Sequence, residues 1–501
     1  MDIFNSLLGG FAMMLNPTAL LWIVVGSFIG TFVGALPGLG PSAGVAILLP
    51  VSFALQPAEG LSLLIAIYLG CTYGGRITSI LLNVPGDPAA VVTCFDGFPL
   101  MKQGKGGKAL GCTGISSFVG GMIGIIIMTF FTPLLANVAL AFGPPELFSV
   151  MVFALIAVNM ATDNSSKKGM IMLFFGLVLA TVGADYLTGR MRLVFGIPKL
   201  MDGIQFVNAA VGLFGLAEVF IGMEQTLKER LLSVKGDVGN LFPTWAELKS
   251  ITKATLIGTS VGCTVGMLPG SGCTVCTFVA YGACKKASKH PEMFGKGSLE
   301  GVSGPEAADN ASVAASMIPM LALGIPTSAT AAMIMGGFIM HDLQPGPMMF
   351  IKSADVAWAI IAGLYICNFI LLFINMGMVP LFVGMIRAAQ PILYPTVAVL
   401  CIIGIYSINN SMFDVIVTMV FGVIGYFAKK GRFPVAGLLL ALILGPNLEA
   451  TFRQTAIMAR GDYTIFLTRP IAMVFLILTV LTFVYPIISN KIFKTKAEKS
   501  C

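Results

Sequence analysis

Long apolar stretches without a single charged side chain dominate the chain. A helix that crosses a bilayer needs about 20 mostly apolar residues, so each stretch can hold one or two crossings. Two further apolar stretches, 169–184 and 470–490, each have the length of one crossing. The charge-free stretches are 3–58, 109–145, 254–284, 310–340 and 356–386.

The pattern inside these stretches predicts helices. Strands that cross a membrane alternate apolar and polar residues with a period of two, and that alternation is absent here. Only helices and closed barrels satisfy their backbone hydrogen bonds in hydrocarbon. The sequence therefore predicts an all-α polytopic membrane protein with roughly 10–13 transmembrane helices, some of them broken or re-entrant.

Two glycine-proline bends interrupt the apolar stretches at matching places. Gly34-Ala-Leu-Pro-Gly-Leu-Gly40 matches Gly266-Met-Leu-Pro-Gly-Ser-Gly272 at an offset of 232 residues. A second pair, Ile80-Leu-Leu-Asn-Val-Pro85 and Leu321-Ala-Leu-Gly-Ile-Pro326, follows at an offset of 241. Interrupted segments at matching places in two halves are typical of secondary transporters, which bind substrate between their repeats. The alternative is that glycine and proline are simply frequent in membrane helices.

This repeat predicts a division of the chain into four parts. Residues 1–223 form the first transmembrane repeat, 224–253 a polar interfacial linker, 254–428 the second repeat, and 429–501 the C-terminal helices and a basic tail. Lysine and arginine in short loops favour the cytoplasmic side of a membrane. We therefore expect the Lys429-Lys-Gly-Arg432 loop and the C-terminal tail to lie inside.

Composition agrees with a membrane protein and argues against an enzyme. Hydrophobic residues make up 56% of the chain and charged residues 11%, whereas soluble proteins carry roughly 25% charged residues. Nine of the ten cysteines lie in or beside apolar segments, so we expect packing roles for them. The metalloprotease motif H-E-x-x-H is absent, and we expect neither catalysis nor a cofactor.

The breaks offer backbone groups to a ligand, and we expect substrate to bind where the four breaks meet. Proline ends a helix, and flanking glycines let a ligand approach the main chain. Helix N-termini suit a carboxylate, while free carbonyls and hydroxyls suit Na⁺. The hydroxyls have an alternative role in bonding a turn of their own helix. The candidate substrate-binding residues at the breaks are Gly38, Gly40, Ser42, Asn83, Gly86, Gly270, Ser271, Gly272, Pro326, Thr327 and Ser328.

Arg76 is the sharpest candidate for binding substrate. It follows a long charge-free run and precedes the Pro85 break. A charged side chain inside a membrane is costly and usually functional. Its planar guanidinium can hold a carboxylate through two hydrogen bonds. The alternatives are an ion pair with Asp87 or Asp96, or a side chain that reaches the membrane edge.

Acidic and amide side chains beside the breaks are candidates for binding a coupling cation, Na⁺ or H⁺. In the first half these are Asn83 and Asp87, and in the second half Asp309 and Asn310. Glu306 enters the same apolar run. Carboxylates inside a membrane often mark cation or proton sites. The alternative for the second-half residues is a cap at the start of a helix.

The chain resembles the large transmembrane subunit of the tripartite tricarboxylate transporters of bacteria. The resemblance runs over nearly the whole chain and rests on long, ordered motifs. They are Gly34-Ala-Leu-Pro-Gly-Leu-Gly-Pro-Ser42, Tyr73-Gly-Gly, Ile80-Leu-Leu-Asn-Val-Pro-Gly86, Phe95-Asp-Gly-Phe-Pro-Leu100, Gly301-Val-Ser-Gly-Pro-Glu-Ala-Ala-Asp-Asn310, Leu323-Gly-Ile-Pro326 and Gln344-Pro-Gly-Pro347.

The resemblance implies uptake of a tricarboxylate or another small carboxylate across the bacterial inner membrane, driven by a Na⁺ or H⁺ gradient. It implies a small four-helix membrane subunit and a periplasmic solute-binding protein as partners, and it leaves a homodimer open. The two halves would be inverted repeats that move in an elevator-like way. Members of the family often carry a serine where this chain has Arg76 and a small residue where it has Asp87. The alternatives are a passive anion channel and a transporter of a different acidic solute.

Overall fold

The computed structural model describes residues 3–36, 39–160, 166–185, 188–226, 240–270, 272–389 and 393–498. Within these ranges nearly all regular structure is helical. The strands in the described ranges form one antiparallel hairpin, in which β1 (Gly183–Ala184) pairs with β2 (Met191–Arg192). The predicted all-α fold class is confirmed.

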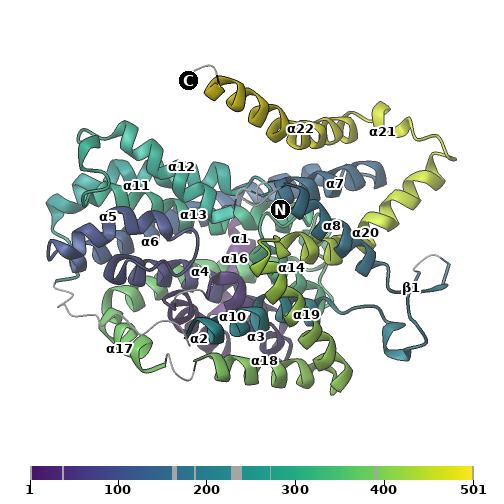
Figure 1. Ribbon diagram of the computed structural model, residues 1–501, viewed down its shortest axis with the longest axis horizontal. Helices are drawn as coiled ribbons and strands as arrows, with labels where there is room; N and C mark the ends of the chain where they lie inside the picture. The colour runs from purple at the N-terminus through teal and green to yellow at the C-terminus, as the bar shows by residue number, and fades with distance from the viewer. Residues whose placement is uncertain are drawn as a thin grey trace.

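In the first half the long helix α4 packs against α2, α3, α5 and α6 (Figure 1). A 3₁₀ turn, η1 (Pro198–Leu200), follows the β-hairpin, and a π-helix, η2 (Val211–Leu216), joins the last two helices of this half. The helices are α1 (Ile3–Met14), α2 (Pro17–Gly34), α3 (Pro41–Phe53), α4 (Pro57–Leu82), α5 (Val91–Lys102), α6 (Gly106–Ala139), α7 (Pro144–Met160), α8 (Ser166–Ala180), α9 (Phe206–Ala210) and α10 (Ala217–Thr226).

In the second half α11, α12 and α13 lie side by side next to α6 (Figure 1). The short turn η3 (Pro291–Met293) precedes α13. The helices are α11 (Trp245–Gly266), α12 (Gly272–Ala287), α13 (Leu299–Leu323), α14 (Ala329–Met340), α15 (Met349–Lys352), α16 (Ala354–Gly377), α17 (Val379–Ala389), α18 (Leu393–Asn409), α19 (Met412–Lys430), α20 (Val435–Met458), α21 (Ile465–Thr468) and α22 (Pro470–Glu498).

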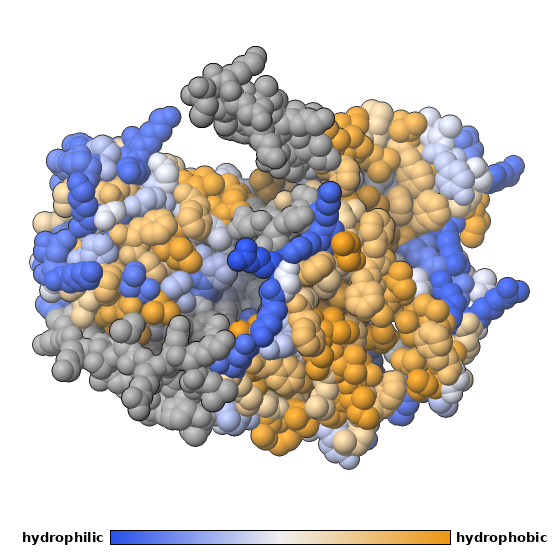
Figure 2. Space-filling model, viewed as in Figure 1, coloured by the Kyte–Doolittle hydropathy of each residue, from blue (hydrophilic) through white to orange (hydrophobic). Residues whose placement is uncertain are grey.

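Length and hydropathy make this a multi-pass membrane protein. Seven helices of the described chain are long and apolar enough to cross a bilayer, and six shorter apolar helices accompany them. Figure 2 shows hydrophobic residues over a broad area of one face, with hydrophilic residues at its left and right edges. Large apolar side chains exposed on α8, such as Phe174 and Ile171, are suited to contact with lipid.

The helices break at the positions that the glycine-proline bends in the sequence predicted. In the first half α2 ends at Gly34 and α3 begins at Pro41, and in the second half α11 ends at Gly266 and α12 begins at Gly272. Each of these two pairs of helices therefore forms a helical hairpin whose tip is the glycine-proline bend. Pro37 and Gly38 of the first tip and Ser271 of the second lie outside the described residues.

The second pair of breaks shares one backbone feature. Asn83, which follows α4, has a left-handed conformation with φ of 58°, and Gly324, which follows α13, has φ of 71°. A left-handed residue commonly ends a helix because its N–H can still satisfy a carbonyl of the last turn. In both halves a proline stands two residues further on and prevents the helix from restarting at once.

Glycines spaced by four residues bring each hairpin close to the long helix of its own half. Gly26, Gly30 and Gly34 of α2 contact α4, and a methyl group on Gly30 would lie 2.5 Å from the carbonyl oxygen of Ile67. Gly262 of α11 packs just as closely against α13, since a methyl group there would lie 2.3 Å from the carbonyl oxygen of Ala308. Small residues at this spacing allow membrane helices to pack backbone against backbone.

The contacts also fix the helix directions. Residues spaced by four along α2 contact residues spaced by four along α4, in the same order along the chain. The same holds for α11 and α13, so the two helices of each pair run parallel. In contrast, α4 and α13 run antiparallel. Arg76 of α4 and Glu306 of α13 bond the same Ser117 hydroxyl, whereas Thr72, one turn earlier on α4, bonds Asn310, one turn later on α13. The two hairpins therefore enter from opposite ends of the α4–α13 pair.

Part of the predicted polar linker is helical. Helix α10 continues through Thr226, and α11 begins at Trp245 after an N-terminal capping box made by Thr244 and Glu247. Residues 245–253 thus form the first turns of α11. Residues 227–239 lie outside the described chain.

Candidate functional site

The two breaks of the second half adjoin each other beside α4. The backbone N–H of Gly270, in the tip of the α11–α12 hairpin, donates to the carbonyl of Thr327 at 3.0 Å. Cys273, one turn further on, lies 3.2 Å from the Tyr68 hydroxyl, sulfur to oxygen. The Pro326 break, the second hairpin tip and the middle of α4 are therefore in direct contact.

The two breaks of the first half also adjoin each other. Gly86 packs against Gly34, and a methyl group on Gly86 would lie 2.0 Å from the Gly34 carbonyl oxygen. A methyl group on Gly40 would lie 3.5 Å from Cβ of Asp87. Ser42, in the first turn of α3, reaches the second half through a 2.8 Å hydrogen bond with Thr330 of α14. The predicted breaks of both halves thus belong to one connected region.

Arg76 lies inside the protein and does not reach a membrane edge. Its side chain is 1% exposed and sits over the ring of Tyr73, with 5.0 Å from Cζ to the ring centroid. Nη1 donates to the Ser117 hydroxyl at 3.2 Å. Nε and Nη2 are buried and find no hydrogen-bond partner among the described residues. Buried unpaired donors are costly, so these atoms are ready to bind a carboxylate.

The carboxylates expected as partners of Arg76 are used elsewhere. Asp87 accepts a hydrogen bond from the backbone N–H of Ala90 at 2.8 Å and closes the turn before α5. Asp96 holds the loop before α13: its Oδ1 accepts from the N–H groups of Gly295, Gly297 and Ser298 at 2.8, 2.9 and 2.8 Å. The ion-pair interpretation with Asp87 or Asp96 is therefore wrong, because the hydrogen bond that Arg76 makes among the described residues goes to Ser117 and to neither carboxylate.

Glu306 is the acidic residue that approaches Arg76 through a shared partner. Its Oε2 accepts from the Ser117 hydroxyl at 3.4 Å, and its Oε1 accepts from the Thr93 hydroxyl at 2.5 Å. The helix-cap interpretation of Glu306 is wrong, because the residue lies within α13 and Ser298 caps that helix. Four helices, α4, α5, α6 and α13, thus contribute to one buried polar cluster.

The predicted cation residues of the second half lie one turn beyond this cluster. Asn310 accepts from the Thr72 hydroxyl at 2.9 Å and donates to the carbonyl of Glu306 at 3.1 Å. Asp309 is 2% exposed, and its Oδ1 has no hydrogen-bond partner among the described residues. Both residues lie inside α13, so they do not cap its start. A buried carboxylate oxygen without a donor is suited to a cation or a proton.

Some of the other predicted residues have a structural role, and others have a buried polar group that is available to a ligand. Ser328 caps α14 by accepting from the N–H of Ala331 at 3.2 Å, the local role considered for such hydroxyls. The Thr327 hydroxyl, next to the buried Pro326, is buried without a partner among the described residues. Asn83 ends α4, and Gly272 begins α12 with φ of 52°.

Sequence reasoning missed several uncharged residues of the site. Tyr68, Thr72 and Tyr73 precede Arg76 at helical spacing on α4, which was the signal that they share its face. Thr93 and Ser117 carried no comparable signal, because isolated hydroxyls in apolar helices commonly bond their own backbone.

A buried arginine and buried acidic residues beside helix breaks, within a multi-pass helical protein, are typical of membrane transporters. The sequence comparison makes this specific. The tripartite tricarboxylate transporter TctA family matches residues 20–440, and the chain belongs to this family. The predicted family resemblance is therefore confirmed.

Two relatives from Agrobacterium vitis illustrate the match. An uncharacterized 52.8 kDa protein in the TAR-I ttuC' 3'region is 39% identical over 472 residues, which cover 94% of each chain. An uncharacterized protein in the TAR-II ttuC' 3'region is 41% identical over 211 residues, 42% of this chain and 87% of the relative. No solved structure matches the chain.

Proposed function

We propose that the chain imports a tricarboxylate or another small carboxylate across the bacterial inner membrane, coupled to a Na⁺ or H⁺ gradient. The observation that carries this proposal is the pair of Arg76 nitrogens, buried at the crossing of α4 and α13, that find no partner in the described parts of the chain. A guanidinium in this state favours an anion, and its planar fork matches a carboxylate.

We propose that the coupling cation binds near Asp309 and Asn310. Oδ1 of Asp309, which has no hydrogen-bond partner in the part of the chain that the structure describes, lies on the same helix as Glu306, about one turn from the arginine cluster. A cation there would offset the charge of an anionic substrate nearby. Asn83 and Asp87 remain candidates on the first-half side.

We further propose two inverted repeats that move relative to the rest of the protein. Both halves have the order helical hairpin, long helix, left-handed residue, proline break and short helix. The antiparallel course of α4 and α13 supports the inversion. Repeats of this kind place the substrate site between the two halves.

The proposed partners are a small four-helix membrane subunit and a periplasmic solute-binding protein. Vesicles that carry all three components provide the test. Uptake of labelled citrate and related acids should follow an imposed Na⁺ or H⁺ gradient and saturate with substrate. Uptake that no gradient drives, for any acid tested, would exclude the proposal, and current through the purified protein in a planar bilayer would favour a channel.

A further inference from the structure

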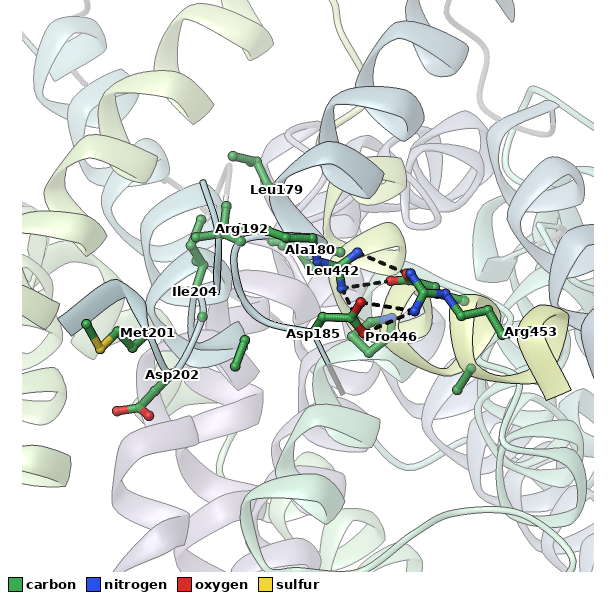
Figure 3. Close-up of a pocket in the computed structure, with 15 residues that line it drawn as sticks. Leu179, Ala180, Asp185, Arg192, Met201, Asp202, Ile204, Leu442, Pro446 and Arg453 are labelled. Atoms are coloured by element: carbon green, nitrogen blue, oxygen red, sulfur yellow. Dashed lines mark hydrogen bonds and ion pairs between the residues drawn. The ribbon is translucent and has the colours of Figure 1, made fainter. Parts of the chain in front are cut away.

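A charged cavity whose lining contains neither Arg76 nor its contact residues lies between the β-hairpin and the C-terminal half of α20. Its volume is about 390 Å³, within the range of roughly 300–1,000 Å³ of ligand sites. Figure 3 shows Asp185 and Arg192 from the hairpin and Arg453 from α20 pointing toward one another at this cavity. Asp202 and Glu449 complete its charged lining.

The charges of this cavity alternate in sign. Arg192 makes two hydrogen bonds to Glu449, at 2.9 and 3.2 Å, and Arg453 makes two to Asp185, at 3.1 and 3.0 Å. Arg453 also pairs with Glu449. The side chains of Arg192 and Arg453 remain 30% and 33% exposed, and Nε of Arg192 has no hydrogen-bond partner among the described residues. Positively and negatively charged side chains are thus both available to a ligand.

An apolar cleft continues from the charged cavity. Its volume is about 330 Å³, and it shares Ala180 and Glu449 with the cavity. Its apolar lining includes Phe148 of α7, Leu177 of α8 and Phe452 of α20. The neighbouring surface of α8 exposes large apolar side chains. The combined site is therefore polar at one end and apolar at the other, where it meets the lipid-facing surface.

Helix contacts place this site at one membrane face. Lys168, at the start of α8, donates to the carbonyl of Gly431, so the start of α8 lies beside the basic 429–432 loop. Both α8 and α20 then run from that loop toward the cavity. The fifteen residues of α8 span roughly 22 Å. The cavity therefore lies at the face opposite the basic loop.

We propose that the cavity and the cleft together bind one phospholipid whose headgroup carries both a phosphate and an ammonium group, as in phosphatidylethanolamine. The phosphate would contact the arginines, the ammonium would contact Asp185, Asp202 or Glu449, and an acyl chain would fill the cleft. A purely anionic headgroup or a carboxylate substrate would meet three carboxylates. This proposal does not depend on the proposed transport function.

Native mass spectrometry of the full-length, delipidated protein in detergent tests the proposal. Phosphatidylethanolamine should remain bound as one molecule and bind about tenfold more tightly than phosphatidylglycerol. Glycerophosphoethanolamine, which has the same headgroup without chains, should bind much more weakly. This arm separates a lipid from a free phosphate compound.

Two substitutions act on opposite ends of the site. Arg453→Gln removes a headgroup contact, and Thr181→Trp fills the apolar cleft without touching the ion pairs. Each should weaken phosphatidylethanolamine binding about tenfold. Lys199→Gln, on the exposed turn η1 that follows the hairpin and outside the cavity, is the matched control and should have no effect.

Equal binding of the two phospholipids, or binding that Thr181→Trp leaves unchanged, would overturn the proposal. The proposal would also be overturned if the delipidated protein formed dimers that Thr181→Trp disrupts, because a second copy of the chain would then cover the cleft. If Arg453→Gln fails to fold, Thr181→Trp decides alone, since its ion pairs are intact.

Discussion

Arg76 of α4 and Glu306 of α13 contact the same hydroxyl group, that of Ser117 on α6. The two hydrogen bonds measure 3.2 Å to Nη1 of the arginine and 3.4 Å to Oε2 of the glutamate. The opposite charges are thus held near each other by a neutral bridge. Nε and Nη2 of the guanidinium keep no partner among the residues that the structure describes. The shared hydroxyl also links both halves of the chain through one buried contact.

Arg76→Ala should abolish carboxylate uptake while expression and membrane insertion stay normal. The loss of charge-assisted hydrogen bonds should weaken substrate binding by about tenfold to a hundredfold. The measurements are uptake into vesicles and substrate binding by the purified variant. Poor insertion or low stability of Arg76→Ala would instead indicate a structural role. Uptake at normal affinity in a well-inserted variant would contradict a role in binding substrate.

Asp309→Asn should uncouple uptake from the cation gradient. The substitution keeps the shape of the side chain but removes the charge that would attract Na⁺ or a proton. Uptake should therefore depend at least tenfold less on the concentration of the coupling cation, whereas substrate binding should persist. Asp355→Asn, at the exposed start of α16, is the control. An unchanged cation dependence would show that Asp309 is not part of the cation site.

Gly262→Val should destabilise the second helical hairpin. The added side chain would overlap the backbone of Ala308, and overpacking of this kind costs about 1–3 kcal/mol or more. Gly282→Val on α12 is a matched helical control, because a methyl group at Gly282 meets no atom within 4 Å. Thermal unfolding in detergent should give a lower unfolding temperature for Gly262→Val than for Gly282→Val. Equal unfolding temperatures would rule out the close packing of α11 on α13.

Asp96→Ala should lower stability with little effect on substrate affinity. The aspartate satisfies three backbone N–H groups before α13 and the Tyr281 hydroxyl. Leaving a buried donor unsatisfied costs about 1–3 kcal/mol. Asp96→Asn retains an acceptor and should be milder. A normal unfolding temperature with weakened substrate binding would place Asp96 in the binding site instead.

The sequence by itself determined the helical class, the family and the positions of the helix breaks. These depend on local properties: apolar length decides which segments can cross a membrane, and proline with glycine ends a helix wherever it occurs. It also singled out Arg76, Asp309 and Asn310, because charged and amide groups are rare in apolar segments.

Only the tertiary structure decided which residues meet. The contacts of Thr72 with Asn310 and of Tyr68 with Cys273 join positions more than 200 residues apart in the chain. Asp96 and Asp87 looked like partners of Arg76 in sequence, yet each binds backbone donors of a turn or loop. The choice depends on helix directions and on glycine contacts between helices. Those are set by packing over the whole fold, so no local pattern contains them.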